Sequence, residues 1–157
     1  MIADGKSTQD VENAILDIGE SADMGAVRDW TRAYAGTCFR TNASTGYSNG
    51  RFEQAQDPDV KEVIPAFKFA ALHDDRTRPW HEAAHGLIAD TLDPIWATFR
   101  PPIGWNCRCS PNFISKFELE RLGLLENGRV RRHVPPTFGS AHPDPGFRPG
   151  AFDFAGG

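Results

Sequence analysis

A literal HExxH motif runs from His81 to His85. On a helix, this spacing places both histidines on one face as zinc ligands, and Glu82 can act as general base toward a metal-bound water. The neighbouring residues disfavour this chemistry, because Pro79 and Gly86 leave only about two helical turns between them. A zinc-dependent hydrolase of the metalloprotease kind is therefore the alternative function, not the preferred one.

A second pattern is Cys107-Arg108-Cys109. In an extended segment, residues two apart point to the same side, so both thiolates can face one metal ion while Arg108 points away. With His81 and His85 the two cysteines would make a tetrahedral Cys2His2 set. We expect a structural zinc ion there, because four protein ligands leave no position for water. The alternative is that the cysteines are small buried residues and the histidines hydrogen-bond within a loop network.

The chain has three cysteines in 157 residues. An odd and small number of cysteines is poorly suited to a disulfide framework, so it favours a reducing compartment or a metal site. A disulfide within the CxC pair is less attractive under reducing conditions. Cys38 lies at helical core spacing, so we expect it to be a core residue.

Two groups of arginines could contact a phosphate or an acidic partner. Arg76 and Arg78 precede the short histidine helix and could hold a phosphate or a carboxylate. The simpler interpretation is that Asp75 or Thr77 caps this helix while an arginine pairs with a neighbouring acid or carbonyl.

The second group is Arg129, Arg131 and Arg132, which could touch DNA phosphates or an acidic neighbour. The whole chain has 17 Lys and Arg against 21 Asp and Glu, a net charge of −4, so broad coating of DNA is disfavoured.

Helical signals dominate the N-terminal third. Ser7 and Asp10 resemble a capping box that opens a short helix ending at Gly19. Asp23 can cap a longer helix whose apolar stripe continues into residues 41–47. Another capping box, Ser115 with Glu118, opens a helix that stops at Gly123.

Strand signals follow in the middle of the chain. Residues 63–72 alternate in the period typical of a strand with one buried face, and Pro65 confines this strand to an edge or delays its start. Further on, frequent prolines leave room only for short strands, at 86–89 and 107–109.

These elements predict an α+β fold, with N-terminal helices packed on a small, mostly antiparallel sheet. The 15 Gly and 12 Pro make it loop-rich, and many of them lie in an extended C-terminal arm that gains order against a partner or the domain surface. We expect an N-terminal helical region at 1–50, a core with the Cys/His cluster at 51–128 and the tail at 129–157.

Membrane insertion and secretion are not predicted. No stretch approaches about 20 consecutive apolar residues. The segment Met1 to Asp10 is polar where a signal peptide needs a basic and then an apolar region.

The order of the motifs is more specific than any one of them. The segment from Arg40 to Gly123 resembles the phage Mu F-like minor head protein family. The resemblance rests on two patterns in this order, D-x-R-T-R-P-x-H from Asp74 and P-P-x-x-W-N-C-R-C from Pro101. The stretch Asp144-Pro145-Gly146-Phe147 also looks like the C-terminal end of this family.

The resemblance implies a structural protein of tailed-phage heads, from a phage, prophage or gene-transfer particle. Such a protein is present in few copies and acts near the portal in head assembly or DNA packaging. Its expected partners are the portal and the major capsid protein, and its expected location is the virion, after assembly in the host cytoplasm. The resemblance also makes Glu82 a local substitution and not a catalytic base.

Overall fold

The computed structural model describes residues 7, 9–10, 13–14, 17 and 28–149. The chain forms two compact units, residues 1–43 and residues 44–157, and the boundary lies within the long helix α2, Arg28–Gln54. In the first unit the predicted capping box is confirmed: the Ser7 N–H donates to Asp10 Oδ2 at 2.7 Å, and the Asp10 N–H donates to Ser7 Oγ at 3.2 Å. The predicted cap at Asp23 and the helix end at Gly19 lie outside the described residues. Cys38 is half-buried, which is less than a core position requires.

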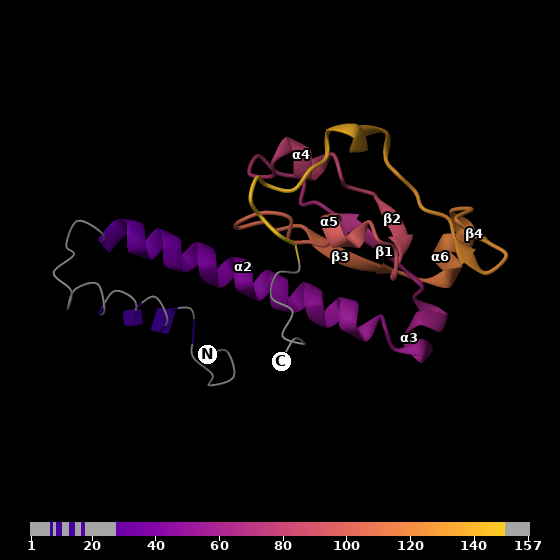
Figure 1. Cartoon of the computed structure of the whole chain (residues 1–157), viewed down its shortest axis with the longest axis horizontal. Coiled ribbons are helices and arrows are strands. Elements are labelled where there is room, and N and C mark those ends of the chain that lie inside the picture. The colour runs from indigo at the N-terminus through magenta and orange to yellow at the C-terminus, as the bar shows by residue number, and fades with distance from the viewer. Residues whose placement is uncertain (1–6, 8, 11–12, 15–16, 18–27, 150–157) are drawn as a thin grey trace. The chain divides into compact units, whose positions relative to one another are not determined.

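A three-stranded antiparallel sheet organises the second unit, with strand order β2-β1-β3 (Figure 1). The strands are β1 (Ala66–Ala70), β2 (Ile88–Asp90) and β3 (Ser110–Ile114). Phe67 of β1 lies opposite Ala89 of β2 and Phe113 of β3. The α+β fold class is therefore confirmed.

Short elements surround the sheet. Asp57 caps α3 by accepting the N–H of Asp59 at 2.9 Å, and Pro58 occupies the first helical turn, where its missing N–H costs nothing. The remaining elements of the second unit are α3 (Pro58–Val63), α4 (Pro79–Glu82), α5 (Trp96–Phe99), α6 (Lys116–Arg121), β4 (Leu125–Glu126), β5 (Arg129–Val130) and the 3-10 helix η3 (Pro136–Ser140).

The core lies on both faces of the sheet. On one face, Phe67 stacks on Phe52 from the end of α2 at 4.2 Å between ring centroids, and Trp96 of α5 meets the same ring edge-on. On the other face, Ala66 packs in a smaller cluster with Leu119 of α6. The prediction of a single buried face was therefore incomplete, because α6 covers part of the second one.

The strand predictions were partly right. The strand expected within 63–72 is β1, and Pro65 delays its start without confining it to an edge, because β1 is the central strand. The strand expected at 86–89 begins two residues later, at Ile88. The strand expected at 107–109 was wrong, since both cysteines precede β3, which begins at Ser110. Pro111 is tolerated within β3 because that strand lies at the sheet edge.

The helix caps were also partly right. Ser115 caps α6 by accepting the N–H of Glu118 at 3.2 Å, as predicted. The cap predicted for α4 at Asp75 or Thr77 was wrong. The N-cap residue is Arg78, which makes no side-chain capping hydrogen bond, and Thr77 Oγ1 instead donates to the carbonyl of Leu72.

The C-terminal tail packs against the surface of the second unit as far as residue 149, where the described residues end, in line with the prediction. After β5 the chain, orange to yellow in Figure 1, returns past α4. Thr137 Oγ1 donates to the carbonyl of Ala83 at 3.0 Å. Phe138 packs on Phe99 at 4.7 Å, and His142 stacks on Trp80 at 5.3 Å between ring centroids.

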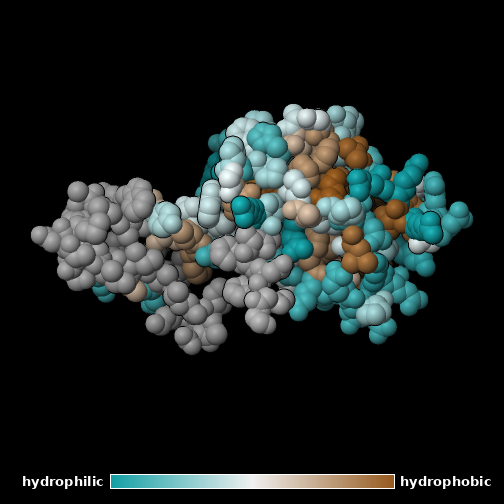
Figure 2. Space-filling model, in the orientation of Figure 1, coloured by the Kyte–Doolittle hydropathy of each residue, from teal (hydrophilic) through white to brown (hydrophobic). Residues whose placement is uncertain are grey.

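Hydrophobic side chains also reach the surface of the second unit, where Figure 2 shows apolar residues among polar ones on the visible face. The most exposed large ones are Phe117 at 75%, Val63 at 61% and Leu92 at 60%. Among the described residues, no helix combines the length and hydrophobicity that crossing a bilayer requires.

Candidate metal centre

His81 lies on α4, a helix of only four residues between Pro79 and Glu82. Its side chain points into the unit and is buried, with 1% of the residue exposed. A buried imidazole needs partners for both ring nitrogens, because an unpaired polar group in the interior is costly. The two partners come from segments far along the chain.

The first partner of His81 is Asp144 of the tail. Its Oδ1 lies 3.1 Å from His81 Nε2 and accepts the indole N–H of Trp80 at 3.1 Å. Its Oδ2 forms an ion pair with Arg78 Nη2 at 3.2 Å. The N–H of Asp144 donates to the carbonyl of Ile103 at 2.8 Å. Two side chains, Trp80 and Arg78, and one backbone hydrogen bond therefore hold the carboxylate beside the buried imidazole.

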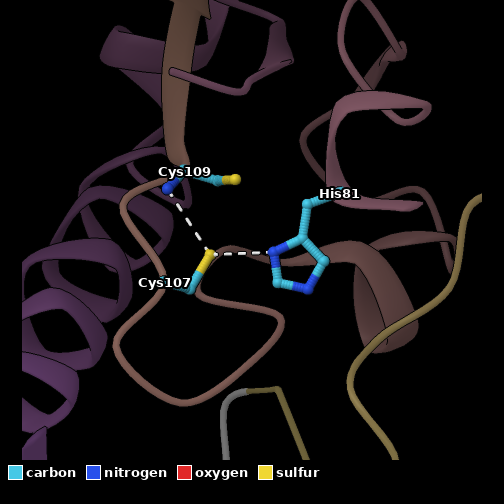
Figure 3. A group of neighbouring side chains, drawn as sticks. All are labelled: His81, Cys107 and Cys109. Atoms are coloured by element: carbon cyan, nitrogen blue, oxygen red, sulfur yellow. Dashed lines mark hydrogen bonds between the residues drawn. The ribbon is translucent and has the colours of Figure 1, made fainter. Parts of the chain in front are cut away.

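The second partner of His81 is Cys107, whose Sγ lies 3.5 Å from His81 Nδ1 (Figure 3). Cys107 belongs to the loop between α5 and β3, and this loop turns back so that the Cys109 N–H donates to Cys107 Sγ at 3.4 Å. Cys107 and Cys109 are both buried, with 4% and 7% exposed. The two thiols converge through a loop turn and not through the strand geometry that the sequence suggested.

Gly104, in the same loop, allows the close packing at this point. A Cβ at Gly104 would lie 2.2 Å from Asp144 Oδ2 and 2.9 Å from His81 Cε1. Any side chain there would displace the carboxylate, so the backbone approaches the His81–Asp144 pair closely only because this residue is glycine.

The two thiols share one proton between them. Hydrogen bonding from Cys109, with further hydrogen bonds from His81 and from backbone N–H groups, lowers the pKa of Cys107 to about 4, although burial opposes this shift. The pKa of Cys109 is raised, because its thiol donates to the Cys107 thiolate and is itself buried. Cys107 is therefore the thiolate of the pair and Cys109 the thiol that stabilises it.

Arg108, between the cysteines, pairs with an acid from another part of the chain. Its Nη1 and Nη2 bind the two oxygens of Asp74 at 2.5 and 2.6 Å in a bidentate ion pair. This pairing holds the pKa of Asp74 well below its ordinary value. The Asp74–Arg108 pair thereby ties the cysteine loop to the turn before α4.

His85 does not join the cluster, contrary to the predicted Cys2His2 set. Its Nδ1 accepts the N–H of Ala71 at 3.1 Å, and its ring meets the ring of His73 edge-on at 4.2 Å. Burial, together with the charges of His73 and Lys68, lowers the pKa of His85. Within the part of the chain that the structure describes, the group whose ligand atoms all lie within 4.8 Å of one another consists of His81, Cys107 and Cys109.

The HExxH motif lacks the geometry of a hydrolase. The helix ends at Glu82, so His81 and His85 do not share one helical face. The Glu82 carboxylate is exposed and binds His73 Nδ1 at 2.9 Å, which turns it away from the buried cluster. Glu82 is therefore not placed to activate a water held by His81.

Of the two arginines before α4, Arg78 serves the cluster. It donates to the carbonyl of Trp105 at 2.9 Å and pairs with Asp144, which matches the simpler interpretation of a bond to an acid and a carbonyl. Arg76 is exposed, and no described residue binds its guanidinium.

The C-terminal arginines are partly neutralised by neighbours. Arg132 binds both oxygens of Asp93, and Arg131 lies 3.7 Å from Glu126 and donates to the carbonyl of Gly123. Arg129 is exposed on β5. None of these contacts involves His81, Cys107 or Cys109, so the C-terminal arginines do not belong to the His/Cys cluster.

Asp144 and Gly104 are the residues of this site that sequence reasoning missed. Both belong to stretches that carried the family resemblance, but nothing in their local pattern shows that they meet. Asp144 follows His81 by 63 positions, so only folding brings the two together.

The fold and the cluster define a small α+β domain built around a buried histidine, two cysteines and a tail carboxylate. The chain belongs to the family described as Phage Mu protein F like protein, whose model matches residues 1–111. The match includes His81, Cys107 and Cys109 but ends before Asp144.

The chain is also similar in sequence to two named F proteins of Mu-like phages. The chain is 36% identical over 88 residues to the putative capsid assembly protein F of Escherichia phage Mu, and this stretch covers 56% of the chain and 20% of that protein. It is 40% identical over 88 residues to the Mu-like prophage FluMu F protein of Haemophilus influenzae, covering 56% of the chain and 21% of that protein. The chain thus matches about a fifth of each relative's length. No solved structure matches the chain.

Proposed function

We propose that the chain is a minor head protein that acts in head assembly of a tailed phage, prophage or gene-transfer particle. The observation that carries the proposal is the family match over residues 1–111, together with a relative named as a capsid assembly protein. The partners we propose are the portal and the major capsid protein, and the location is the virion, reached from the host cytoplasm during assembly.

The structure is consistent with an assembly component in two respects. The second unit is held by short strands, by loops and by a tail that packs across them, and such a loop-rich unit suits a protein stabilised by neighbours. It also exposes large apolar side chains, Phe117 and Val63 among them, which are available for contacts with other head proteins.

The hydrolase alternative has weaker support, because Glu82 binds His73 at the surface and does not face the cluster. It is tested by measuring peptide cleavage with added zinc for the wild type and for Glu82→Gln. We expect no zinc-dependent turnover in either. Turnover that the substitution abolishes would establish the alternative and refute our proposal of a purely structural role.

The charges of residues 129–132 give little support to a direct contact with DNA. Asp93 pairs with Arg132, and Glu126 pairs with Arg131. Of the three C-terminal arginines, Arg129 is the one that is exposed and makes no ion pair with a described residue. One phosphate contact adds little affinity. We therefore place the role of the chain in protein contacts within the head.

The central experiment is performed on particles made by a strain that produces the full protein. Proheads and finished particles are purified separately, and both are analysed by mass spectrometry and by chemical cross-linking. We expect the protein in few copies, with cross-links to the portal. A strain with a stop codon in the gene is the control, and it should yield fewer or aberrant heads.

Two results would refute the proposal. One is absence of the protein from both proheads and finished particles. The other is a normal yield of heads from the stop-codon strain, since an assembly component cannot be dispensable for assembly.

A further inference from the structure

Three donor atoms of the kinds that zinc prefers converge in the interior of the second unit. They are His81 Nδ1 and the Sγ atoms of Cys107 and Cys109, all within 4.8 Å of one another. All three residues are buried, with at most 7% exposed. We propose that His81, Cys107 and Cys109 bind one zinc ion, and that Asp144 of the tail orients His81 for it.

The separation of two of the donor atoms fits a tetrahedral ion. Zinc lies about 2.3 Å from a thiolate sulfur and about 2.0–2.1 Å from an imidazole nitrogen, so a tetrahedral angle separates the two donors by about 3.6 Å. Cys107 Sγ and His81 Nδ1 lie 3.5 Å apart. These two donors therefore need almost no movement to hold an ion between them.

The environment of His81 selects the correct nitrogen for the metal. A neutral imidazole carries its proton on one nitrogen and a lone pair on the other. Asp144 can only accept, so it keeps a proton on Nε2, and the bound ion would replace the proton that Nδ1 otherwise donates to the Cys107 thiolate. A ligand histidine commonly donates its other N–H to a carboxylate in this way.

The rest of the Asp144 environment keeps this carboxylate in place. Trp80 and Arg78 bind its two oxygens, and its backbone N–H binds the carbonyl of Ile103 in the cysteine loop. The tail, α4 and the cysteine loop thus meet at one residue. Loss of the metal is expected to loosen all three segments.

The ligand set is Cys2His and not the Cys2His2 set that the sequence suggested. His85 Nδ1 is occupied by the N–H of Ala71, and the described residues supply a group of three ligands. Zinc prefers four ligands, so a water molecule completes the tetrahedron. The proposal concerns the isolated chain and is independent of its role in the head.

The first test is the zinc content of the full chain, purified without chelator and without a polyhistidine tag. Elemental analysis should give about one zinc per chain. The variants Cys107→Ser, Cys109→Ser and His81→Gln should each fall to near zero. The matched controls Cys38→Ser and His85→Gln should keep the wild-type content, because neither residue belongs to the set.

Because a ligand variant can simply fail to fold, the wild type is also examined directly. X-ray absorption at the zinc edge should show two sulfur and two nitrogen or oxygen neighbours. Replacement of zinc by cobalt should produce the charge-transfer absorption of a thiolate ligand. Wild-type protein without zinc would overturn the proposal, and so would a spectrum without sulfur. Loss of zinc from folded His85→Gln equal to that from His81→Gln would overturn the ligand set.

The role of Asp144 as a positioning residue has its own test. Asp144→Asn should weaken zinc affinity by about 10-fold to 100-fold, the usual effect of changing a carboxylate behind a metal-bound histidine. Asp144→Glu should restore part of the loss. Asp93→Asn, which removes an aspartate that binds Arg132 instead, is the control and should leave the affinity unchanged. Wild-type affinity in folded Asp144→Asn would overturn this role.

Discussion

Gly104→Ala is the substitution that most directly tests the packing of the cluster. The added Cβ would lie 2.2 Å from Asp144 Oδ2, and an ordinary carbon–oxygen contact is about 3.3 Å, so the carboxylate must retreat by roughly 1 Å. His81 Cε1, at 2.9 Å from the same position, leaves little room on the other side. Retreat of the carboxylate lengthens its bonds to Trp80 and Arg78.

The expected cost combines two effects. Overpacking of a well-packed site costs about 1–3 kcal/mol. A weakened hydrogen bond to a charged group adds up to about 1.5–3 kcal/mol. Because the tail can move in part, we expect Gly104→Ala to lower the free energy of unfolding by about 2–4 kcal/mol. For a domain of this size, the melting temperature falls by roughly 4 °C per kcal/mol.

The assay is urea unfolding followed by tryptophan fluorescence, with and without chelator. Gly139→Ala is the control, since a Cβ at Gly139 meets nothing within 4 Å, and its effect should stay within about 0.5 kcal/mol. In an Asp144→Ala background the cost of Gly104→Ala should shrink by about 1–3 kcal/mol, because the main clash is gone. Equal cost in both backgrounds, or no cost in the wild type, would refute the reasoning.

Three further predictions concern other parts of the second unit. Asp74→Asn should reduce stability at neutral pH, because Arg108 lowers the folded-state pKa of Asp74 and the ionised carboxyl therefore stabilises the fold. The effect should shrink progressively as the pH falls from about 4, the unfolded-state pKa, toward the lower folded-state pKa. A pH series of urea midpoints checks it, and a difference that stays constant from neutral pH into acid would contradict it. Ser115→Ala should cost about 1 kcal/mol by uncapping α6, and Ser115→Asp, which keeps the cap, should cost much less in the same assay. Gly50→Ala should stabilise the protein by about 0.5–1 kcal/mol, because Gly50 lies inside α2 with nothing within 4 Å of its Cβ position; a lower melting temperature would show that the helix needs glycine there.

Local sequence patterns anticipated the elements whose formation depends on near neighbours. The alternation of Phe67 and Phe69 with polar or small residues predicted β1, and Ser115 predicted the start of α6. These signals work because a strand has a period of two and because an N-cap needs one short polar side chain at one position. The order of the motifs also identified the family correctly, because motif order is a property of the sequence and does not depend on the fold.

Local sequence patterns did not predict the positions of side chains that depend on packing between distant segments. HExxH spacing implies a helix through His85, but α4 ends at Glu82, so the second histidine turns toward Ala71. The cysteine pair suggested a strand, but a loop that precedes β3 brings the thiols together. Neither result follows from the spacing of residues, because irregular backbone has no period.

For this protein, short-range information was sufficient for the fold class, for most of β1 and α6, and for naming His81, Cys107 and Cys109, together with His85, as candidate metal ligands. The composition of the candidate centre required the folded chain. Folding excluded His85, added Asp144 from the tail and gave Gly104 its importance as the point of closest approach. The physical reason is that helix periods and caps are set within a few residues, whereas a buried imidazole takes its partners from whichever segments the packing of the core brings beside it.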